Sequence, residues 1–209
     1  MERLKRNLLP VAIAIVLFLI PFFWLKQGEM DLGGDSSRLY FYDPASYILH
    51  NIFSSVSGNG VGQIQYGNYS QLPHVAMLLV LKGFLGSTYL ITLFNSLKLA
   101  VGFLAMYAII KEFLSINSNT HANRLREVSS ILGGLFYIFS RHMVANYDVA
   151  LIHHNQVFLN PLVFYLLLKY FLTTNVKYIW ATLLLTILFA PNFAYLNMLP
   201  YLSIPSAPS

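Results

Sequence analysis

The sequence STYLITLFNSLKLAVGFLAMYAIIKEF, from Ser87 to Phe113, decides the fold class of this chain. It is almost entirely apolar and exceeds the ~20 residues that an α-helix needs to cross a bilayer. The whole chain is 56% hydrophobic and only 10% charged, whereas a globular domain carries about 25% charged residues. This composition predicts an all-α fold, a polytopic helical membrane protein.

Five apolar runs are predicted to cross the membrane: residues 8–25, 87–113, 128–145, 156–172 and 178–194. The first follows the basic residues Arg3, Lys5 and Arg6 and ends in an aromatic group of the kind found at membrane interfaces. No small-residue cleavage site follows it, which favours a signal anchor over a cleaved signal peptide. The N-terminus is therefore predicted to be cytoplasmic, and the residues after the first span extracytoplasmic.

A long polar loop, residues 26–70, follows the first span. It contains four of the chain's eight acidic residues: Glu29, Asp31, Asp35 and Asp43. The pair Asp43-Pro44 predicts a helix start, with aspartate at the N-cap and proline at the first helical position. Apolar residues then recur at helical spacing, namely Ile48, Leu49, Ile52, Phe53 and Val56. This helix is too short to cross, and we expect it to lie flat in the membrane interface.

Residues 71–85 are apolar but short, and the basic residues decide how they are placed. If they do not cross the membrane, eight of the thirteen Lys and Arg residues are cytoplasmic, four are outside and Lys98 is within the bilayer. If they cross, five are cytoplasmic and seven outside. Cytoplasmic loops carry an excess of basic residues. The first arrangement is therefore favoured, with 71–85 re-entrant or packed against the bundle.

That topology brings most residues capable of acid–base chemistry to the outer face, His74 among them. Asp31 and Asp35 are candidates for a general base or for a carboxylate that orients an acceptor hydroxyl. The alternative is that Asp31 caps a turn and Asp35 caps a short helix beginning at Ser36. Asp43 is a capping residue and also a candidate for substrate binding, two roles that are compatible.

A second polar segment contains Arg141, Asp148, His153 and His154. Its basic and imidazole groups suit a phosphate or a sugar, and an interfacial polar loop is the alternative. Adjacent residues of a helix point about 100° apart, so the histidine pair is not predicted to be a metal site, although a divalent cation is left open as a cofactor. In the acidic loop, Tyr66 is a candidate for stacking on a sugar.

Lys98 lies near the middle of its apolar run, where a charged group is costly unless it faces protein, water or a partner. Two interpretations stay open. Lys98 faces a polar bundle interior near a lipid phosphate, or it pairs with Asn95 or a backbone carbonyl. The basic residues are otherwise scattered at helix ends, so nucleic-acid binding is not predicted.

Several motifs together resemble the GT-C class of integral-membrane glycosyltransferases, and within it the bacterial α-(1→3)-arabinofuranosyltransferases. Asp35 precedes Asp43-Pro44 by eight residues, as in that family. The further motifs are Gly62-Gln63-Ile64-Gln65-Tyr66-Gly67, then Pro73, then Gly133-Gly134-Leu135-Phe136-Tyr137-Ile138-Phe139-Ser140, and Ala190-Pro191-Asn192. The family's basic residue two positions after the first aspartate is Ser37 here, and Arg38 follows it.

The resemblance implies transfer of a sugar from a polyprenyl-phosphate donor to a cell-envelope glycan or lipid acceptor at the outer face of the cell membrane. Asp35 would be the general base, with Asp31 the second candidate. Arg38, Arg141 and His154 would contact the donor phosphate. Members of this class have more spans, so the chain is expected to be the N-terminal portion of a longer enzyme. The alternatives are a transporter or flippase subunit and a non-catalytic membrane scaffold.

Overall fold

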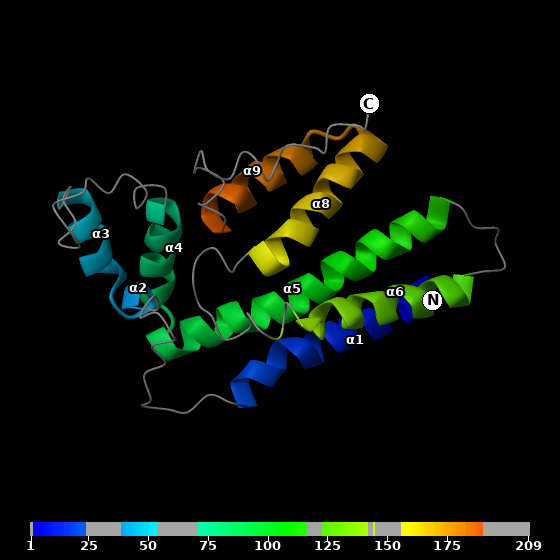
Figure 1. Ribbon diagram of the computed structural model, residues 1–209, viewed down its shortest axis with the longest axis horizontal. Coiled ribbons are helices and arrows are strands. Elements are labelled where there is room, and N and C mark those ends of the chain that lie inside the picture. Colours follow the sequence, from blue (N-terminus) through cyan, green and yellow to red (C-terminus); the bar gives the residue numbers. More distant parts are fainter. Residues whose placement is uncertain are drawn as a thin grey trace.

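The computed structural model describes residues 2–23, 39–53, 71–116, 123–141, 144 and 156–189. Across these ranges the regular elements are helical and no strand occurs, which confirms the predicted all-α class. The helices are α1 (Glu2–Phe23), α2 (Leu39–Tyr42), α3 (Pro44–Phe53), α4 (Leu72–Lys82), α5 (Ser87–Ile116), α6 (Asn123–Ile138), α8 (Gln156–Thr173) and α9 (Lys177–Phe189), as Figure 1 shows.

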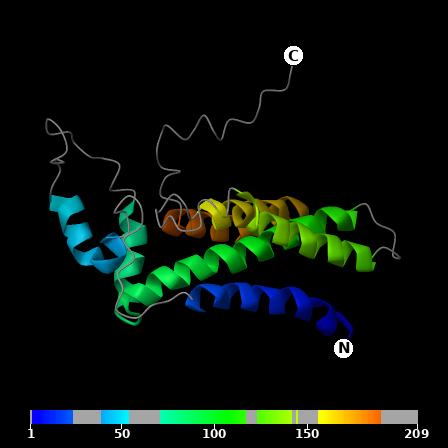
Figure 2. The same ribbon diagram turned by 60° about the horizontal axis from the view of Figure 1, so that its bottom comes forward.

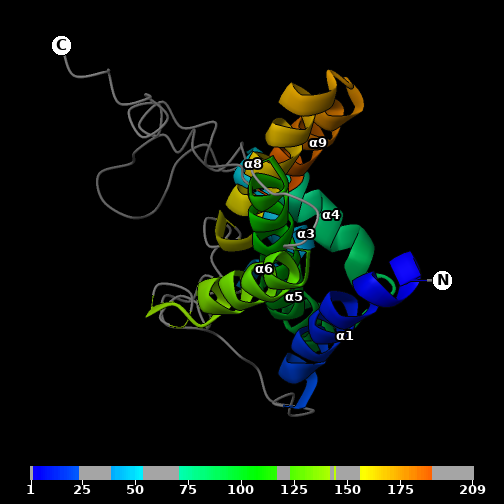
Figure 3. The same cartoon turned by 90° about the vertical axis from the view of Figure 1, so that its right-hand side faces the viewer.

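Helix α5 is the centre of the arrangement. Helices α1, α6 and α8 all pack along it, and α9 packs on α8. Figure 3 shows α1 and the α8–α9 pair on opposite sides of α5. One buried cluster joins four of these helices through the apolar residues Ala14, Leu17, Leu99, Phe103, Ile138 and Val157. Burial of these side chains holds α5 inside the bundle, whereas α9 contributes no fully buried residue.

The bundle has two ends, at which different helix termini lie. The N-terminus, the end of α5, the start of α6 and the turn between α8 and α9 lie together in Figures 1 and 2. We call this the basic end, because it carries Lys111, Arg124, Arg126, Lys169 and Lys177. Helices α2, α3 and α4 lie at the opposite end, which we call the α4 end, with the last turn of α9 beside α4. Helices α1 and α6 run towards this end, and α6 ends about halfway along α5, near Leu99 and Phe103 (Figure 1).

One helix among the described residues, Ser87–Ser115 within α5, is long and apolar enough to cross a membrane. The other apolar helices are shorter, at Leu8–Phe23, Leu72–Lys82, Val157–Thr173 and Lys177–Phe189. Of the five predicted spans, 87–113 therefore meets the requirement on length and composition. The other four stay predictions. Three of the corresponding helices end before the predicted bounds, at Phe23, Ile138 and Phe189, whereas α8 covers the whole of 156–172.

The segment 71–85 forms α4, an 11-residue helix. At 1.5 Å per residue it covers roughly half of a ~30 Å hydrocarbon core. It contacts α2, α3, the first half of α5 and the end of α9. Buried residues of α2, α4 and α5 form its core, namely Tyr40, Phe41, Val75, Leu78, Leu90, Ile91 and Phe94. Its length and position are those expected of a segment that packs against the bundle without crossing.

Helix α3 begins at Pro44, as predicted. The Ser46 amide donates a hydrogen bond of 3.1 Å to Asp43 Oδ1, which confirms Asp43 as the capping residue. The expected apolar face is described only in part. Ile48 packs against the α2–α4–α5 core and Leu49 is exposed; the side chains of residues 52, 53 and 56 lie outside the described set.

Two adjacent glycines in α6 predict opposite effects of one substitution. A Cβ on Gly134 would lie 2.8 Å from the Phe103 ring and 3.0 Å from the Phe103 carbonyl oxygen, both of which are fixed in the core. A Cβ on Gly133 would meet only the end of the flexible Ile110 side chain. We expect Gly134→Ala to destabilise the fold by about 1–3 kcal/mol through overpacking.

Gly133→Ala is the matched control, because both changes add one methyl group to the middle of the same helix. It should be neutral or stabilising, since alanine is favoured over glycine in a helix interior by about 1 kcal/mol. Thermal unfolding in detergent would measure both effects. Equal shifts in Tm for the two variants would contradict the assigned packing of α6 on Phe103.

Candidate functional site

Of the predicted site residues, the structure describes Asp43 and Arg141. Asp31, Asp35, Arg38, Tyr66, His153 and His154 lie outside the described residues. Asp43 and Arg141 are both exposed. Asp43 lies in the turn between α2 and α3, and Arg141 follows the end of α6. The site is therefore described through these two residues and through the helices that flank the remaining ones.

Helices α2, α3 and α4 are joined into one unit by side-chain hydrogen bonds. The Tyr47 hydroxyl of α3 donates to Gln71 Oε1, directly before α4, over 2.5 Å. The Lys82 ammonium, in the last turn of α4, donates to the carbonyl oxygen of Tyr42, which ends α2. The Asp43 cap fixes the turn between α2 and α3. These contacts fix α2 and α3, the described part of the acidic loop, against α4.

His74 of α4 is completely buried inside an aromatic cluster. Its ring centre lies between 5.6 and 6.5 Å from those of Tyr40, Phe41, Phe94 and Phe189. The Nδ1 atom donates a hydrogen bond of 2.6 Å to the Leu188 carbonyl at the end of α9. Among the described residues Nε2 has no hydrogen-bond partner.

Burial lowers the pKa of His74 from 6.5 to about 4, although the hydrogen bond to Leu188 acts in the opposite direction. The imidazole is therefore neutral at pH 7 and shielded from water. His74 belonged to the outer-face residues expected to be capable of acid–base chemistry. The structure corrects that expectation, because this side chain is part of the core that attaches α9 to α4.

A chain of contacts links the helices on either side of 145–155 to α4. The Tyr137 hydroxyl near the end of α6 donates to the Val157 carbonyl at the start of α8, over 2.5 Å. Phe158 of α8 contacts Phe189 of α9, with ring centres 5.7 Å apart. Phe189 in turn contacts Phe94 and His74. The end of α6 and the start of α8, which bound 145–155, thus lie near the middle of α5 and are linked through Phe189 to α4 (Figure 1).

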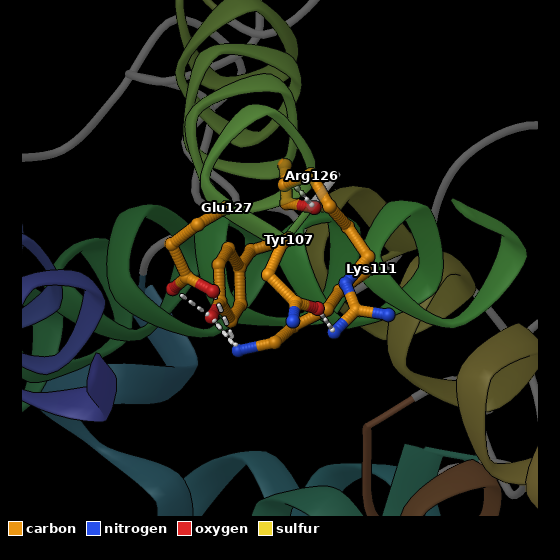
Figure 4. Close-up of polar contacts among 6 residues, drawn as sticks. Tyr107, Lys111, Arg126 and Glu127 are labelled. Atoms are coloured by element: carbon orange, nitrogen blue, oxygen red, sulfur yellow. Dashed lines mark hydrogen bonds and ion pairs between the residues drawn. The ribbon is translucent and has the colours of Figure 1, made fainter. Parts of the chain in front are cut away.

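Two carboxylates at the basic end, Glu112 and Glu127, are held in ion pairs. Lys111 Nζ lies 2.9 Å from Glu127 Oε2. The Tyr107 hydroxyl donates to the other carboxylate oxygen over 2.5 Å, and Lys111 donates to that hydroxyl (Figure 4). Lys169 Nζ of α8 lies 2.8 Å from Glu112 Oε2 of α5. These pairs join α6 and α8 to α5, and sequence reasoning missed them because the partners are on different helices.

Lys98 is only 2% exposed, and its ammonium donates to Asn95 Oδ1 over 3.3 Å. The contact with Asn95, part of one of the two open interpretations, is therefore present in the structure. Within the described ranges, no group of three metal-ligating side chains comes together. The described residues therefore offer no metal centre.

No model of a protein family, no curated protein and no solved structure matches this chain.

Proposed function

We propose that this chain is a membrane glycosyltransferase of GT-C type, or part of one. It moves a sugar from a polyprenyl-phosphate donor to a glycan or lipid acceptor of the cell envelope. The α4 end faces the extracytoplasmic side and the basic end the cytoplasm. Asp35 is the general base, and Asp31 is the second candidate for that role.

The exposed surface of the helices supports a membrane location. Each of the long helices leaves large apolar side chains exposed, among them Val11, Ile15, Leu104, Leu132, Phe136, Phe164, Leu184 and Ile187. Monomeric soluble proteins rarely expose apolar patches beyond a few hundred Å². In a bilayer the same surface contacts lipid acyl chains, so these apolar side chains are not exposed to water.

The observation that carries the proposal is the direction of the helices that flank the two polar segments. Along the sequence, Asp31, Asp35 and Arg38 lie between α1 and α2, and His153 and His154 lie between α6 and α8. Helices α1 and α6 both start at the basic end and run away from it (Figures 1 and 2). Sugar transfer requires a base for the acceptor and cations for the donor phosphate at one place. We infer that both segments lie on the face opposite the basic end and supply both residue types there.

In the proposed reaction the acceptor hydroxyl attacks the anomeric carbon of the donor sugar. Asp35 takes the hydroxyl proton, a glycosidic C–O bond forms, and the bond from the anomeric carbon to the phosphate oxygen breaks. The polyprenyl phosphate leaves with the bonding electron pair. Arg38, Arg141 and His154 stabilise the phosphate charge, while Asp43, Tyr66 and His153 contact the sugar or acceptor.

A transporter or flippase subunit is the second candidate, and Lys98 is the observation that favours it. Ionisable residues inside spanning helices mark ion and substrate pathways in many membrane proteins. Lys98 is buried in the helix that meets the spanning criterion. The contact with Asn95 gives it a local structural role as well, so the transferase proposal takes precedence.

Labelling of single cysteines tests whether the two polar segments share a face. The chain has no native cysteine, so an impermeant thiol reagent added from outside gives a clean background. We expect cysteines placed at Ser37 and Asn155 to be labelled in intact cells, and a cysteine at Ser118 to be protected. Labelling at Ser118 with protection at Asn155 would split the proposed site across the bilayer and exclude it.

Binding of the donor separates the transferase from a scaffold. A photoreactive polyprenyl-phosphate analogue should crosslink to the chain in membranes and be displaced by unlabelled polyprenyl phosphate. The Arg141→Gln variant should crosslink less, whereas Arg124→Gln, which changes an exposed arginine at the opposite end of α6, should crosslink normally. Absence of displaceable crosslinking would favour the scaffold.

A further inference from the structure

The basic end carries cations that no described carboxylate neutralises. Glu112 and Glu127 are already paired with Lys169 and Lys111. Arg126 donates to the neutral Asn123 side chain over 2.8 Å. No ion pair joins Arg124, Arg126 or Lys177 to another described residue. These three cations therefore present net positive charge at one end of the bundle.

Their position within the helices is unfavourable in the isolated chain. Arg124 and Arg126 lie in the first turn of α6, and Lys177 is the first residue of α9. Neither first turn contains an acidic residue. The N-terminus of a helix carries a partial positive charge, so cations there repel the helix dipole. External anions would reduce that repulsion.

Exposed apolar and aromatic side chains lie next to these cations along the sequence. Leu125 is 73% exposed and lies between the two arginines; Trp180 is 68% exposed and follows Lys177 by one turn. Phe171, at the end of α8, is 75% exposed. Tryptophan beside lysine and arginine is typical of the membrane–water interface, where the ring lies at headgroup level and the cations meet phosphates.

We propose that the basic end binds the headgroups of anionic phospholipids in the cytoplasmic leaflet through a surface in two parts, Arg124 and Arg126 on α6 and Lys177 with Trp180 on α9. We call it the headgroup surface. The charge complementarity and the apolar side chains interleaved with the cations select a lipid layer over a soluble anion. The proposal rests on the membrane location proposed above, and it is independent of the sugar-transfer chemistry.

Trp180 provides a probe within the headgroup surface. The chain has two tryptophans, so Trp24→Phe leaves Trp180 as the only one. This variant would be reconstituted into vesicles of phosphatidylcholine and phosphatidylglycerol at one fixed composition. Bromine, which quenches tryptophan on contact, is carried by the acyl chains of one lipid or the other. The vesicle charge is then identical in both samples, and the quenching ratio reports the local lipid composition.

We expect phosphatidylglycerol to be enriched about five-fold around Trp180 for each engaged cation, the ratio that corresponds to the ~1 kcal/mol of a basic residue near an anionic surface. Lys177→Gln, one turn before Trp180 on the same helix, should lower the enrichment. Raising the salt concentration to about 1 M, where the Debye length falls to about 3 Å, should lower it further. Arg141→Gln, which removes an exposed arginine near the other end of α6, should leave it unchanged.

An equal quenching by both lipids, as expected if a protein covers this surface, would overturn the proposal. So would an enrichment that Lys177→Gln leaves intact. Failure of either lipid to quench Trp180 would place this end outside the bilayer and would count against the membrane location too. Loss of sugar transfer with the enrichment preserved would count against the transferase alone, so the two proposals fail separately.

Discussion

Replacing Asp35 by asparagine is expected to abolish sugar transfer while leaving the chain inserted in the membrane. Asparagine has nearly the same shape as aspartate and is equally good at the N-cap of a helix. It cannot take up the proton of an acceptor hydroxyl. General base catalysis contributes about 10²- to 10⁴-fold to rate, and transfer of a radiolabelled sugar from polyprenyl phosphate by isolated membranes should fall by that factor.

Glu29→Gln is the matched control, because it removes one carboxylate from the same loop without touching a predicted site residue. It should retain transfer and insertion. Asp31→Asn tests the second candidate in the same assay. Unchanged transfer by Asp35→Asn would exclude Asp35 as the base, and loss of transfer in Asp31→Asn alone would reassign that role.

Acidification is expected to weaken the attachment of α9 to α4 through His74. Burial lowers the pKa of His74 to about 4 in the folded chain, whereas an exposed histidine has a pKa of about 6.5. The unfolded chain therefore takes up a proton at a higher pH than the folded chain. The contribution of neutral His74 to the free energy of unfolding is fully present above pH 6.5, and it is lost progressively as the pH falls towards 4. The total loss is about 3 kcal/mol.

His74→Gln removes the titration and keeps an N–H group that can donate to the Leu188 carbonyl. We expect its Tm in detergent to fall less than that of the native chain between pH 7 and pH 4.5. The five other histidines are present in both proteins, so their effect on the change of Tm with pH is the same in both. Parallel pH profiles for the two proteins would show that His74 is not held neutral in the folded state.

Features that depend on short stretches of chain could be predicted from the sequence. The apolar length of 87–113 predicts α5, and Asp43-Pro44 predicts the start of α3, because each pattern acts within one or two turns. The pairing of Lys98 with Asn95 belongs to this class, since residues three apart are neighbours on a helix. The all-α class follows from composition and these local signals together.

Contacts between distant helices could not be predicted in the same way. The bond from His74 to the Leu188 carbonyl joins residues 114 positions apart, and nothing in either local sequence identifies the partner. The close approach of Gly134 to Phe103 depends on the angle between α5 and α6. The site residues in the two polar segments remain predictions, because they lie outside the described part of the chain.

The attachment of α9 also bears on the order in which the molecule assembles. A chain is made from its N-terminus, so α1 to α8 are available to pack before α9 is complete. Because α9 contributes no fully buried residue, its last turn gains its place through Phe189 and the Leu188 carbonyl at His74. Contacts between residues far apart in sequence form late, since the intervening chain must be ordered first. Tyr40, Phe41 and Phe94 can enclose His74 before α9 is present, and the side that meets Phe189 and Leu188 is covered only when this last described helix packs.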